Sequence, residues 1–445
     1  MENILEQAQK DNVQFIQLQF TDLLGMMKSL TIPVEHLADS IQYGAWFDGS
    51  AIEGFTRIHE SDMFLKPDLS TYAVIPWLKP EHPEDGETAR LICDVYTPDG
   101  KPYTGDPRYI LKQTMAEAER MGFIYHTGPE LEFFLLKKDQ GIVKPVPHDR
   151  AGYFDLTTDE AQIVRRAIMV ALKKFGITIE SLHHEVAGGQ HEIDLRYAQA
   201  LKTADNGMTL RYVVKAVAQC HQLHATFMPK PFTGIDGSGM HVHQSLFDSK
   251  TNKNVFFEEH SPYHLSDVAL QFIAGQLHHV QAMSAILSPT VNSYKRLVPG
   301  FEAPVYLSWA RLNRSALIRV PQYSSAKTQA ARCELRCPDP CANLYLAFAV
   351  MLKAGLDGIK RKLTPPKPVE ADLYDFSDLR LHAMQIETLP ASLGEALEVM
   401  QADPLIKETL GAHTYEKYLE AKQIEWDMFR LSVSDWELKK YLETY

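Results

Sequence analysis

The stretch Gly128-Pro129-Glu130-Leu131-Glu132-Phe133-Phe134 is the most informative part of the sequence. Proline is disfavoured inside a helix and phenylalanine favours strands, so we predict a β-strand here. Residues i and i+2 of a strand point to the same face, which places the Glu130 and Glu132 carboxylates side by side. Two buried carboxylates repel each other unless a cation compensates them, whereas charges at alternate strand positions otherwise face water. The stretch therefore predicts either a solvated strand edge or a divalent-cation site.

The composition of the 445-residue chain narrows the possible functions. Apolar residues make up 45% and charged residues 23%, as in an ordinary folded globular protein. The net charge of −12 leaves no basic excess to neutralise phosphates, so no nucleic-acid partner is expected. The N-terminus lacks a signal-peptide pattern and no apolar run reaches transmembrane length. These features fit a cytoplasmic enzyme without a membrane partner, but they fit many other cytoplasmic proteins as well.

Two domains are predicted, residues 1–102 and residues 103–445. The first is β-rich, with a helix expected over 3–10 and strands over 13–20, 71–77 and 91–95. It ends at the Pro- and Gly-containing loop 97–102. In the second we expect helices over 107–121, 163–175, 342–358 and within 412–445, the second of them introduced by a capping box from Thr157 to Glu160.

A glycine pair at 188–189 separates two short runs, which is typical of a hairpin. If residues 187–190 form a four-residue loop, Glu185 lies directly opposite Glu192. Like charges at opposite positions destabilise a hairpin, and a cation between them reverses that sign. A glycine-rich loop at 236–239 leads into a further strand, on which His241, His243 and Ser245 share a face.

The inward-facing candidates form an oxygen-rich set: Glu130, Glu132, Glu185, Glu192 and Glu334, with His241. One divalent ion cannot balance that much negative charge, so two or more Mg²⁺ or Mn²⁺ ions are expected. Arginines beside divalent cations are typical of phosphoryl transfer, and Arg296, Arg314, Arg319 and Arg336 supply them. These patterns do not name the substrate. A zinc hydrolase that uses His241 and His243 and a non-catalytic binding protein remain alternatives.

Cys333, Cys337 and Cys341 lie four residues apart, a spacing that matches no zinc-binding pattern. The chain has five cysteines and no secretion signal, so reduced structural thiols are expected.

Eight stretches, in this order, closely resemble type I glutamine synthetase: FDGSAIEGF (47–55), GPELEFF (128–134), HHEVAGGQHEID (183–194), ATFMPKP (225–231), GSGMH (237–241), NSYKRLVPGFEAP (292–304), NRSALIR (313–319) and CELR (333–336). The resemblance implies an α+β fold, with an N-terminal β-grasp domain and a catalytic domain whose antiparallel sheet forms a barrel-like site shared between subunits. It implies ATP-dependent amidation of L-glutamate with ammonium through γ-glutamyl phosphate. It also implies a homo-dodecamer of two hexameric rings.

The resemblance assigns roles to residues by matching position. It implies a first metal site of Glu132, Glu185 and Glu192 and a second of Glu130, His241 and Glu334. ATP contacts are implied for Glu180, His243, Gln244, Ser245, Arg314 and Arg319, and glutamate contacts for Asp236, Gly237, Arg296, Glu302, Arg314 and Arg336. The implied catalytic residues are Asp48, Glu302, Arg314 and Arg336. Glu302 is the acid of a flap over the intermediate, Asp48 reaches the ammonium site of a neighbouring subunit, and Arg57 senses glutamine.

Four departures from the family pattern are visible. Asp236 replaces a usual asparagine, where an acid binds an amino group but repels a carboxylate. The stretch 322–331 is longer than expected and Leu344 replaces a proline. Tyr374 lies near an adenylylation pattern, but the insertion that accompanies this regulation is absent, so we expect the shorter, non-adenylylated subtype.

Overall fold

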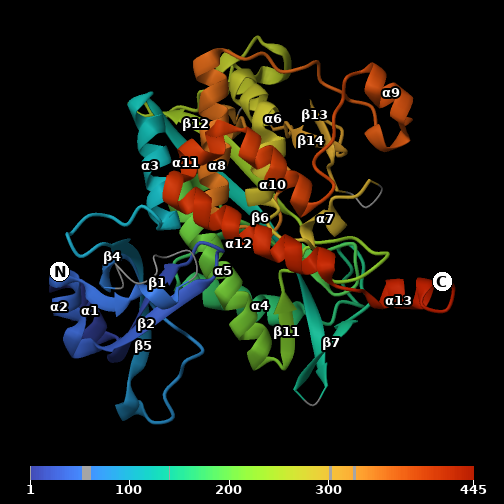
Figure 1. Cartoon of the computed structure of the whole chain (residues 1–445). Helices are drawn as coiled ribbons and strands as arrows, with labels where there is room; N and C mark the ends of the chain where they lie inside the picture. The colour runs from blue at the N-terminus through green and yellow to red at the C-terminus, as the bar shows by residue number, and fades with distance from the viewer. Residues whose placement is uncertain (1, 53–61, 140, 300–302, 324–326) are drawn as a thin grey trace.

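The computed structural model describes residues 2–52, 62–139, 141–299, 303–323 and 327–445, which form two β-sheets flanked by helices (Figure 1). The smaller sheet lies near the N-terminus and has the order β2-β1-β5-β4-β3, with β1 parallel to β5 and the other pairs antiparallel. Its elements are α1 Glu2–Lys10, β1 Val13–Thr21, β2 Met27–Pro33, α2 Leu37–Tyr43, β3 Ala45–Asp48, β4 Asp62–Val74 and β5 Glu87–Tyr96.

The elements predicted for this first part are largely present. The helix over 3–10 and the strand over 13–20 are confirmed as α1 and β1. The strand predicted over 71–77 is the end of the longer β4, which stops at Val74 before Pro76. The strand predicted over 91–95 lies inside β5. One face of this sheet buries apolar side chains, so the first part has a core of its own.

The larger sheet is organised around β6, which pairs with several other strands. Its main order is β13-β14-β15-β12-β6-β9-β8, and β7, β10 and β11 also pair with β6. The strands are β6 Phe123–Asp139, β7 Ile142–Pro147, β8 Ile179–His184, β9 Gln190–Leu195, β10 Ala198–Gln199, β11 Leu223–Thr226, β12 Met240–Asp248, β13 Tyr306–Ala310, β14 Ala316–Arg319 and β15 Cys333–Leu335. Leu131 and Phe133 are fully buried, which leaves Glu130 and Glu132 together on the opposite face.

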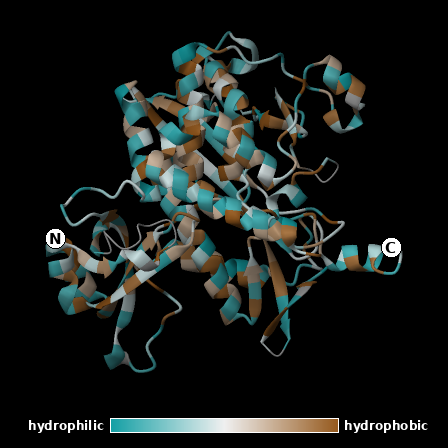
Figure 2. Ribbon diagram, viewed as in Figure 1, coloured by the Kyte–Doolittle hydropathy of each residue, from teal (hydrophilic) through white to brown (hydrophobic). Residues whose placement is uncertain are grey.

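Helices pack around this sheet and bury the larger hydrophobic core. They are α3 Pro107–Arg120, α4 Gln162–Lys174, α5 Ala200–Cys220, α6 Asp267–Leu287, α7 Ser293–Arg296, α8 Leu344–Arg361, α9 Asp378–Ala383, α10 Leu393–Ala402, α11 Pro404–Leu410, α12 Ala412–Leu431 and α13 Asp435–Tyr441. The helices predicted over 107–121 and within 412–445 are confirmed, and α13 projects from the body (Figure 1). Hydrophobic and hydrophilic residues follow one another along the outer helices (Figure 2).

The predicted capping box at the start of α4 is wrong. The helix begins at Gln162, after Ala161, and Thr157 does not cap it. The carboxylate of Asp159 accepts a hydrogen bond from the Ala161 backbone N–H at 2.9 Å and also binds Arg165. Residues before Ala161 form turns, so a motif that fits a capping box in sequence is used differently here.

The helix predicted over 342–358 is also longer than expected. Asn343 caps it, and the helix runs past Gly358 to Arg361 before Lys362 adopts a left-handed conformation with φ of 53°. Gly358 instead allows α8 to cross α6 closely, because a Cβ there would lie 2.1 Å from the Gln271 carbonyl oxygen. The glycine therefore marks a helix crossing and not a helix end.

A buried arginine joins the smaller sheet to the helices of the larger part of the chain. Arg108, in the first turn of α3, is 2% exposed. Its guanidinium donates to Asp68 at 2.7 Å and Asp94 at 2.8 Å, both in the smaller sheet, and to Asp205 of α5 at 2.9 Å. The two parts of the chain therefore share one network of charges. Within the described ranges, no helix is both long and apolar enough to cross a membrane.

Candidate active site

Strand register brings the predicted acidic residues together. Across the β6–β12 pair, Glu130 lies opposite His241, and across the β6–β9 pair, Glu132 lies opposite Glu192. The β12–β15 pair places His243 opposite Glu334. Three antiparallel pairings thus gather carboxylates and imidazoles from distant parts of the sequence on one face of the sheet.

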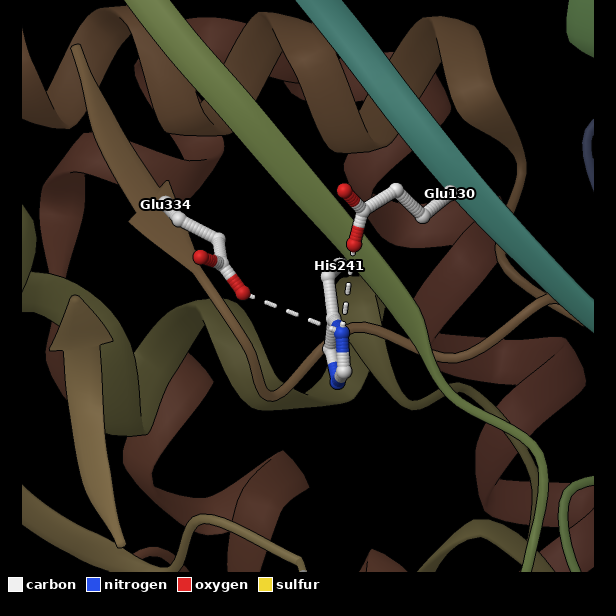
Figure 3. A group of neighbouring side chains, drawn as sticks. All are labelled: Glu130, His241 and Glu334. Carbon is white, nitrogen blue, oxygen red and sulfur yellow. Dashed lines mark ion pairs between the residues drawn. The ribbon is translucent and has the colours of Figure 1, made fainter. Parts of the chain in front are cut away.

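Glu130, His241 and Glu334 form one cluster, with their ligand atoms within 4.8 Å of one another. Figure 3 shows the three side chains converging from β6, β12 and β15. The Nδ1 atom of His241 lies 3.5 Å from Glu130 Oε2 and 3.8 Å from Glu334 Oε1. This is the set that the sequence predicted for the second metal site, and its donors suit a divalent cation.

Basic side chains compensate the carboxylates of this cluster. Arg319 Nε donates to Glu334 Oε2 at 2.6 Å, and an Arg336 N–H donates to Glu334 Oε1 at 2.8 Å. Burial disfavours ionisation of Glu334, but the charges of His243 and Arg336 outweigh it and lower the pKa of Glu334 to about 2. Burial likewise opposes ionisation of Glu130, and the charge of His243 overrides it, so the pKa of Glu130 falls well below its usual range.

His183, Glu185 and Glu192 form another group, whose ligand atoms also lie within 4.8 Å of one another. We call this group, with the neighbouring Glu132, the first cluster, because it contains the residues predicted for the first metal site, and we call Glu130, His241 and Glu334 the second cluster. His183 Nδ1 is 3.4 Å from Glu185 Oε1, and its Nε2 is 3.4 Å from Glu192 Oε1. The predicted hairpin register is wrong, because His183 and not Glu185 lies opposite Glu192. The hairpin closes at Glu185 and Gln190, where the Glu185 N–H donates to the Gln190 carbonyl at 2.8 Å.

The physical reason is the backbone of Gly189. It takes a φ of 73°, and a Cβ there would lie 2.8 Å from a side-chain atom of Pro147. This conformation suits the last loop position, so residues 186–189 form the loop. The loop thus starts and ends one residue earlier than predicted, and the two carboxylates meet diagonally and not face to face.

Glu132 lies between the clusters and is held by donors. Its Oε2 accepts hydrogen bonds from Gln190 Nε2 at 2.9 Å and from the Gly239 N–H at 3.0 Å. Burial raises the pKa of Glu132 to about 7, although the charge of Arg296 opposes this shift. Burial and the charge of Glu132 also raise the pKa of Glu192. These residues fit a bound divalent cation, because it would compensate carboxylates that otherwise share a buried face without enough positive charge.

A cavity of about 760 Å³ opens beside Glu130 and is a candidate nucleotide site. Its lining includes Glu180 and His243, which the sequence predicted, and Tyr197 and Arg332, which it did not. His243 is fixed in place, since its Nε2 lies 2.6 Å from Glu130 Oε1 and its Nδ1 lies 3.2 Å from Arg332 Nε. The cavity is therefore continuous with the Glu130 cluster.

The other two predicted ATP contacts on β12, Gln244 and Ser245, lie on opposite faces of the strand. Ser245 is hydrogen-bonded to Tyr197, so it supports the cavity wall. The Gln244 side chain is fully buried on the opposite face of the strand, where it bonds to Tyr125 and Gln276. The structure does not support a nucleotide contact by the Gln244 side chain. Strand alternation excludes it, because Gln244 lies between two residues that face the site.

Among the predicted glutamate contacts, Gly237 and Arg296 are packed together. A Cβ on Gly237 would lie 2.3 Å from the Pro229 carbonyl oxygen and 3.2 Å from Arg296 Cγ. Arg296 is buried and donates to the carbonyls of Arg336 and Cys337 at 3.2 and 2.9 Å. The Arg296 guanidinium therefore shapes the chain beside the clusters, and its positive charge acts on Glu132 from there.

The remaining predicted residues lie at the edges. Asp236 is half-buried and Arg314 is exposed. Asp48 ends β3 in the smaller sheet, where its exposed carboxylate accepts a hydrogen bond from the Ser50 N–H at 2.8 Å. Glu302 and Arg57 lie outside the described residues.

Two family models together match most of this chain. The family model described as "Glutamine synthetase, catalytic domain" matches residues 104–441, and the one described as "Glutamine synthetase, beta-Grasp domain" matches residues 12–98. The chain belongs to the glutamine synthetase family. Glutamine synthetase of Thermotoga maritima is 50% identical over 446 residues, which cover 99% of both chains, and that of Thermus thermophilus is 50% identical over 445 residues, covering 99% of this chain and 98% of the relative.

Solved structures agree with this glutamine synthetase assignment. GmaS in complex with ADP is 31% identical, with a TM-score of 0.87 over the full length of both chains. Plasmodium falciparum glutamine synthetase is 26% identical, with a TM-score of 0.88 over 99% of this chain and 98% of the other. The predicted α+β fold, with an N-terminal β-grasp domain followed by a glutamine synthetase catalytic domain, is confirmed.

Several residues of this glutamine synthetase site were missed by sequence reasoning. His183 precedes Glu185 by two positions, so strand alternation could have placed it on the same face. Arg332 precedes Glu334 by the same spacing. Tyr153 lies beside the first cluster, because its ring meets that of His183 edge-on, with the ring centres 5.5 Å apart. No local pattern marks Tyr153 or Gln190, because their positions depend on tertiary packing.

The thiolate and zinc alternatives find no support in the described part of the chain. Cys333 and Cys337 are buried free thiols, Cys341 is half-buried, and none of them belongs to a metal-binding cluster. Burial raises the pKa of Cys337 and of Cys341 to about 12, which keeps both thiols protonated. Both ring nitrogens of His243 are already engaged, so the His241-x-His243 pair does not form an open zinc site.

Proposed function

We propose that this member of the glutamine synthetase family joins ammonia to L-glutamate at the expense of ATP, giving L-glutamine, ADP and phosphate through γ-glutamyl phosphate. The observation that carries the proposal is the pair of carboxylate clusters on one face of the sheet, beside a large cavity and two arginines. Full-length relatives that are about half identical and are named glutamine synthetase support it.

In this proposal the two clusters hold two Mg²⁺ or Mn²⁺ ions. Glu132, Glu185 and Glu192 hold the first, and Glu130, His241 and Glu334 hold the second. The bound ions neutralise phosphate oxygens and orient the transferred group. His183 lies 3.4 Å from both Glu185 and Glu192, so its ring is beside the residues that would hold the first ion.

ATP is proposed to occupy the cavity beside Glu130, with contacts from Glu180, His243, Ser245, Tyr197 and Arg332. That GmaS, a structural neighbour, forms a complex with ADP supports a nucleotide site in this fold. Arg319 and Arg336 hold their guanidinium groups at Glu334, next to the end of the cavity that Glu130 lines. There they stabilise negative charge that develops during phosphoryl transfer.

The glutamate site is proposed from the matched motifs: Asp236, Gly237, Arg296, Glu302, Arg314 and Arg336. Glu302 acts as a flap acid that shields the intermediate and helps to deprotonate ammonium. Arg57 responds to glutamine. Arg314 is exposed, so its guanidinium is open to contact with bound phosphate and glutamate.

We further propose a homo-dodecamer of two hexameric rings, of the non-adenylylated type I subtype, with domains at 1–102 and 103–445. In a head-to-tail ring, Asp48 of one subunit completes the ammonium site of the next. Support comes from its exposure at the end of β3, while the cavity lining and both clusters belong to the larger sheet and its loops.

This arrangement is testable by mixing two inactive variants, Asp48→Ala and Arg336→Ala, at equal ratio with unfolding and reassembly. A complete site takes its catalytic domain from the first variant and its neighbour's first domain from the second. Random assembly then restores about a quarter of the sites. If Asp48 acts within its own chain, the mixture stays as inactive as its parents.

The catalytic proposal is tested by amide formation with ATP, L-glutamate and either ammonium or methylamine. We expect glutamine and ADP to form in equal amounts, and we expect ammonium to be a better substrate than methylamine. Preference for methylamine would assign the chain to a ligase of larger amines. Binding of ATP and glutamate without any product would leave a non-catalytic protein.

A further inference from the structure

A buried polar network lies behind the first cluster and is not used by the proposed chemistry. Its centre is Asp149, which follows β7 and is 6% exposed. Asp149 Oδ1 accepts hydrogen bonds from the Gly189 N–H at 2.9 Å and from His184 Nε2 at 3.1 Å. Asp149 Oδ2 accepts one from the Glu160 N–H at 3.1 Å and lies 2.9 Å from His148 Nε2. One carboxylate thus joins two loops and a strand end.

His184 extends this network to the backbone of a cluster residue. Its ring is almost fully buried, and its Nδ1 donates to the Glu185 carbonyl oxygen at 2.7 Å. Both ring nitrogens therefore face oxygen acceptors, Asp149 on one side and Glu185 on the other. Rotation of the His184 ring would break both hydrogen bonds, so Asp149 fixes the orientation of the Glu185 peptide through it.

The far end of the hairpin loop is fixed in the same way. The Gly189 N–H donates to Asp149, while its carbonyl accepts a hydrogen bond from the Leu135 N–H at 2.9 Å. Close packing adds to this, because a Cβ on Gly188 would lie 3.1 Å from the Asp149 carbonyl oxygen. Both ends of the loop 186–189 are therefore held by contacts that include Asp149.

These contacts bear on the first cluster because the loop ends carry its ligands. Glu185 belongs to the cluster, and Gln190, directly after Gly189, donates to Glu132 at 2.9 Å. His191 faces the network, where its ring centre lies 4.7 Å from that of His184, while the next residue, Glu192, faces the cluster. The network thus occupies the back of the same hairpin whose front carries the carboxylates.

We propose that Asp149 is a positioning residue that sets the metal affinity of the first cluster through His184 and Gly189. The inference rests on the proposed function only in taking Glu132, Glu185 and Glu192 as ligands of one divalent ion. Residues that orient metal ligands commonly change metal affinity or activity by roughly 10- to 100-fold when they are replaced. We expect a weakening of that size at the first cluster, with the second cluster unchanged.

The test uses the full-length, metal-free protein and Mn²⁺ alone, titrated by electron paramagnetic resonance to count bound ions and their affinities. The variants are Asp149→Asn, which keeps the side-chain size, and Asp149→Ala. A Glu185→Gln variant shows which class of Mn²⁺ site belongs to the first cluster. The matched control is Asp155→Asn, because this exposed carboxylate lies in the same segment and accepts hydrogen bonds from the Gly152 N–H and Thr158 Oγ1, each at 2.9 Å.

We expect Asp149→Asn and Asp149→Ala to weaken one class of Mn²⁺ site by roughly 10- to 100-fold, the same class that Glu185→Gln affects. Hydrogen exchange of the backbone over 185–190 should also become faster in both variants. Asp155→Asn should leave the Mn²⁺ affinities and this exchange as in the wild-type protein.

Two outcomes would overturn the proposal. Unchanged Mn²⁺ affinities in an Asp149 variant, with or without a lower melting temperature, would show a purely structural role. Equal weakening of both classes of site would show general loss of structure. Failure of the proposed function is seen separately, since a wild-type protein that binds Mn²⁺ at two sites but makes no glutamine would refute glutamine synthesis and leave this test intact.

Discussion

The two carboxylate clusters share one sheet and similar donors, but they differ in how their negative charge is balanced. The Glu130–His241–Glu334 cluster contains its own cations, because β14 and the end of β15 bring Arg319 and Arg336 to Glu334. The cluster on β8 and β9 lies at the other end of the sheet order, and there the imidazole of His183 lies beside the carboxylates of Glu185 and Glu192.

The pKa shifts follow this difference. Burial opposes ionisation in both places, yet neighbouring positive charges lower the pKa values of Glu130 and Glu334, whereas burial and neighbouring carboxylates raise that of Glu192. The first cluster, on β8 and β9, therefore depends on a bound ion for its charge balance. The second cluster, Glu130–His241–Glu334, is balanced by its arginines without one. Identical ligand types can thus create sites of different metal dependence.

Complete removal of divalent metal should have the largest effect. We expect exhaustive chelation to reduce glutamine formation to the background rate, because neither the phosphate charge nor the first cluster is then compensated. Restored Mg²⁺ or Mn²⁺ should recover activity, measured as glutamine formed per minute. Full activity in the chelated protein would show that neither cluster needs a bound ion. Recovery with zinc alone would favour the alternative of a zinc hydrolase.

Neutralising one carboxylate in each cluster should give opposite effects on the stability of the metal-free protein. Glu192→Gln removes a carboxyl that is ionised in the unfolded chain but resists ionisation when buried, so it should raise the free energy of unfolding at neutral pH. Glu130→Gln loses the partner of His243 and should lower that free energy by about 1–3 kcal/mol. Both variants should lose one bound Mn²⁺ and roughly 100-fold or more in activity. Denaturant unfolding with chelator present measures the sign, and equal signs would show that the clusters are not differently balanced.

The raised pKa of Glu132 predicts a pH effect on the metal-free protein. Its value is about 7 in the folded state against an ordinary 4.5, so folding favours the protonated form. This contribution is complete below pH 4.5 and is lost as the pH rises through about 7, by at most about 3 kcal/mol. The measurement is the difference in unfolding free energy between wild type and Glu132→Gln at pH 5 and pH 8.

Saturating Mg²⁺ should abolish that pH-dependent difference in the wild-type protein, because the ion compensates the ionised carboxylate. A difference of the same size with and without Mg²⁺ would show that Glu132 does not face the bound ion.

The smallest effect is expected for the three cysteines near the second cluster. Replacing Cys333, Cys337 and Cys341 together with alanine should leave the number of bound Mn²⁺ ions unchanged, because their thiols are protonated and lie in neither cluster. Metal content and melting temperature measured together separate metal loss from weaker packing. Loss of one ion per chain would revive the thiolate interpretation.

Sequence periodicity was enough to place the carboxylates of β6 and the residues of β12 on the correct faces. Alternation is a local property of strands, so Glu130, Glu132, His241 and His243 could be placed without a structure. The register between strands is not local. The hairpin at 185–190 closed one residue earlier than predicted because Gly189, and not its neighbour, takes the positive φ beside Pro147.

The predictions of two helix ends were wrong for a similar reason. Gly358 has the sequence signature of a helix stop, but its lack of a side chain serves the crossing of α6 and α8. Thr157 and Glu160 have the spacing of a capping box. At this turn, however, the Ala161 N–H donates to Asp159 and the Glu160 N–H donates to Asp149. In both places a tertiary contact decides how a local motif is used, which a single sequence does not reveal.

Arg108 has a consequence for chimaeric enzymes. Its three aspartate partners come from both sides of the proposed boundary at residue 102, so exchanging residues 1–102 for those of a homologue replaces Asp68 and Asp94 but keeps Arg108 and Asp205. A buried guanidinium that loses its carboxylates is costly to the fold. Domain shuffling in this protein therefore requires that the incoming domain supply both acids at the same places, or that Arg108 be exchanged with it.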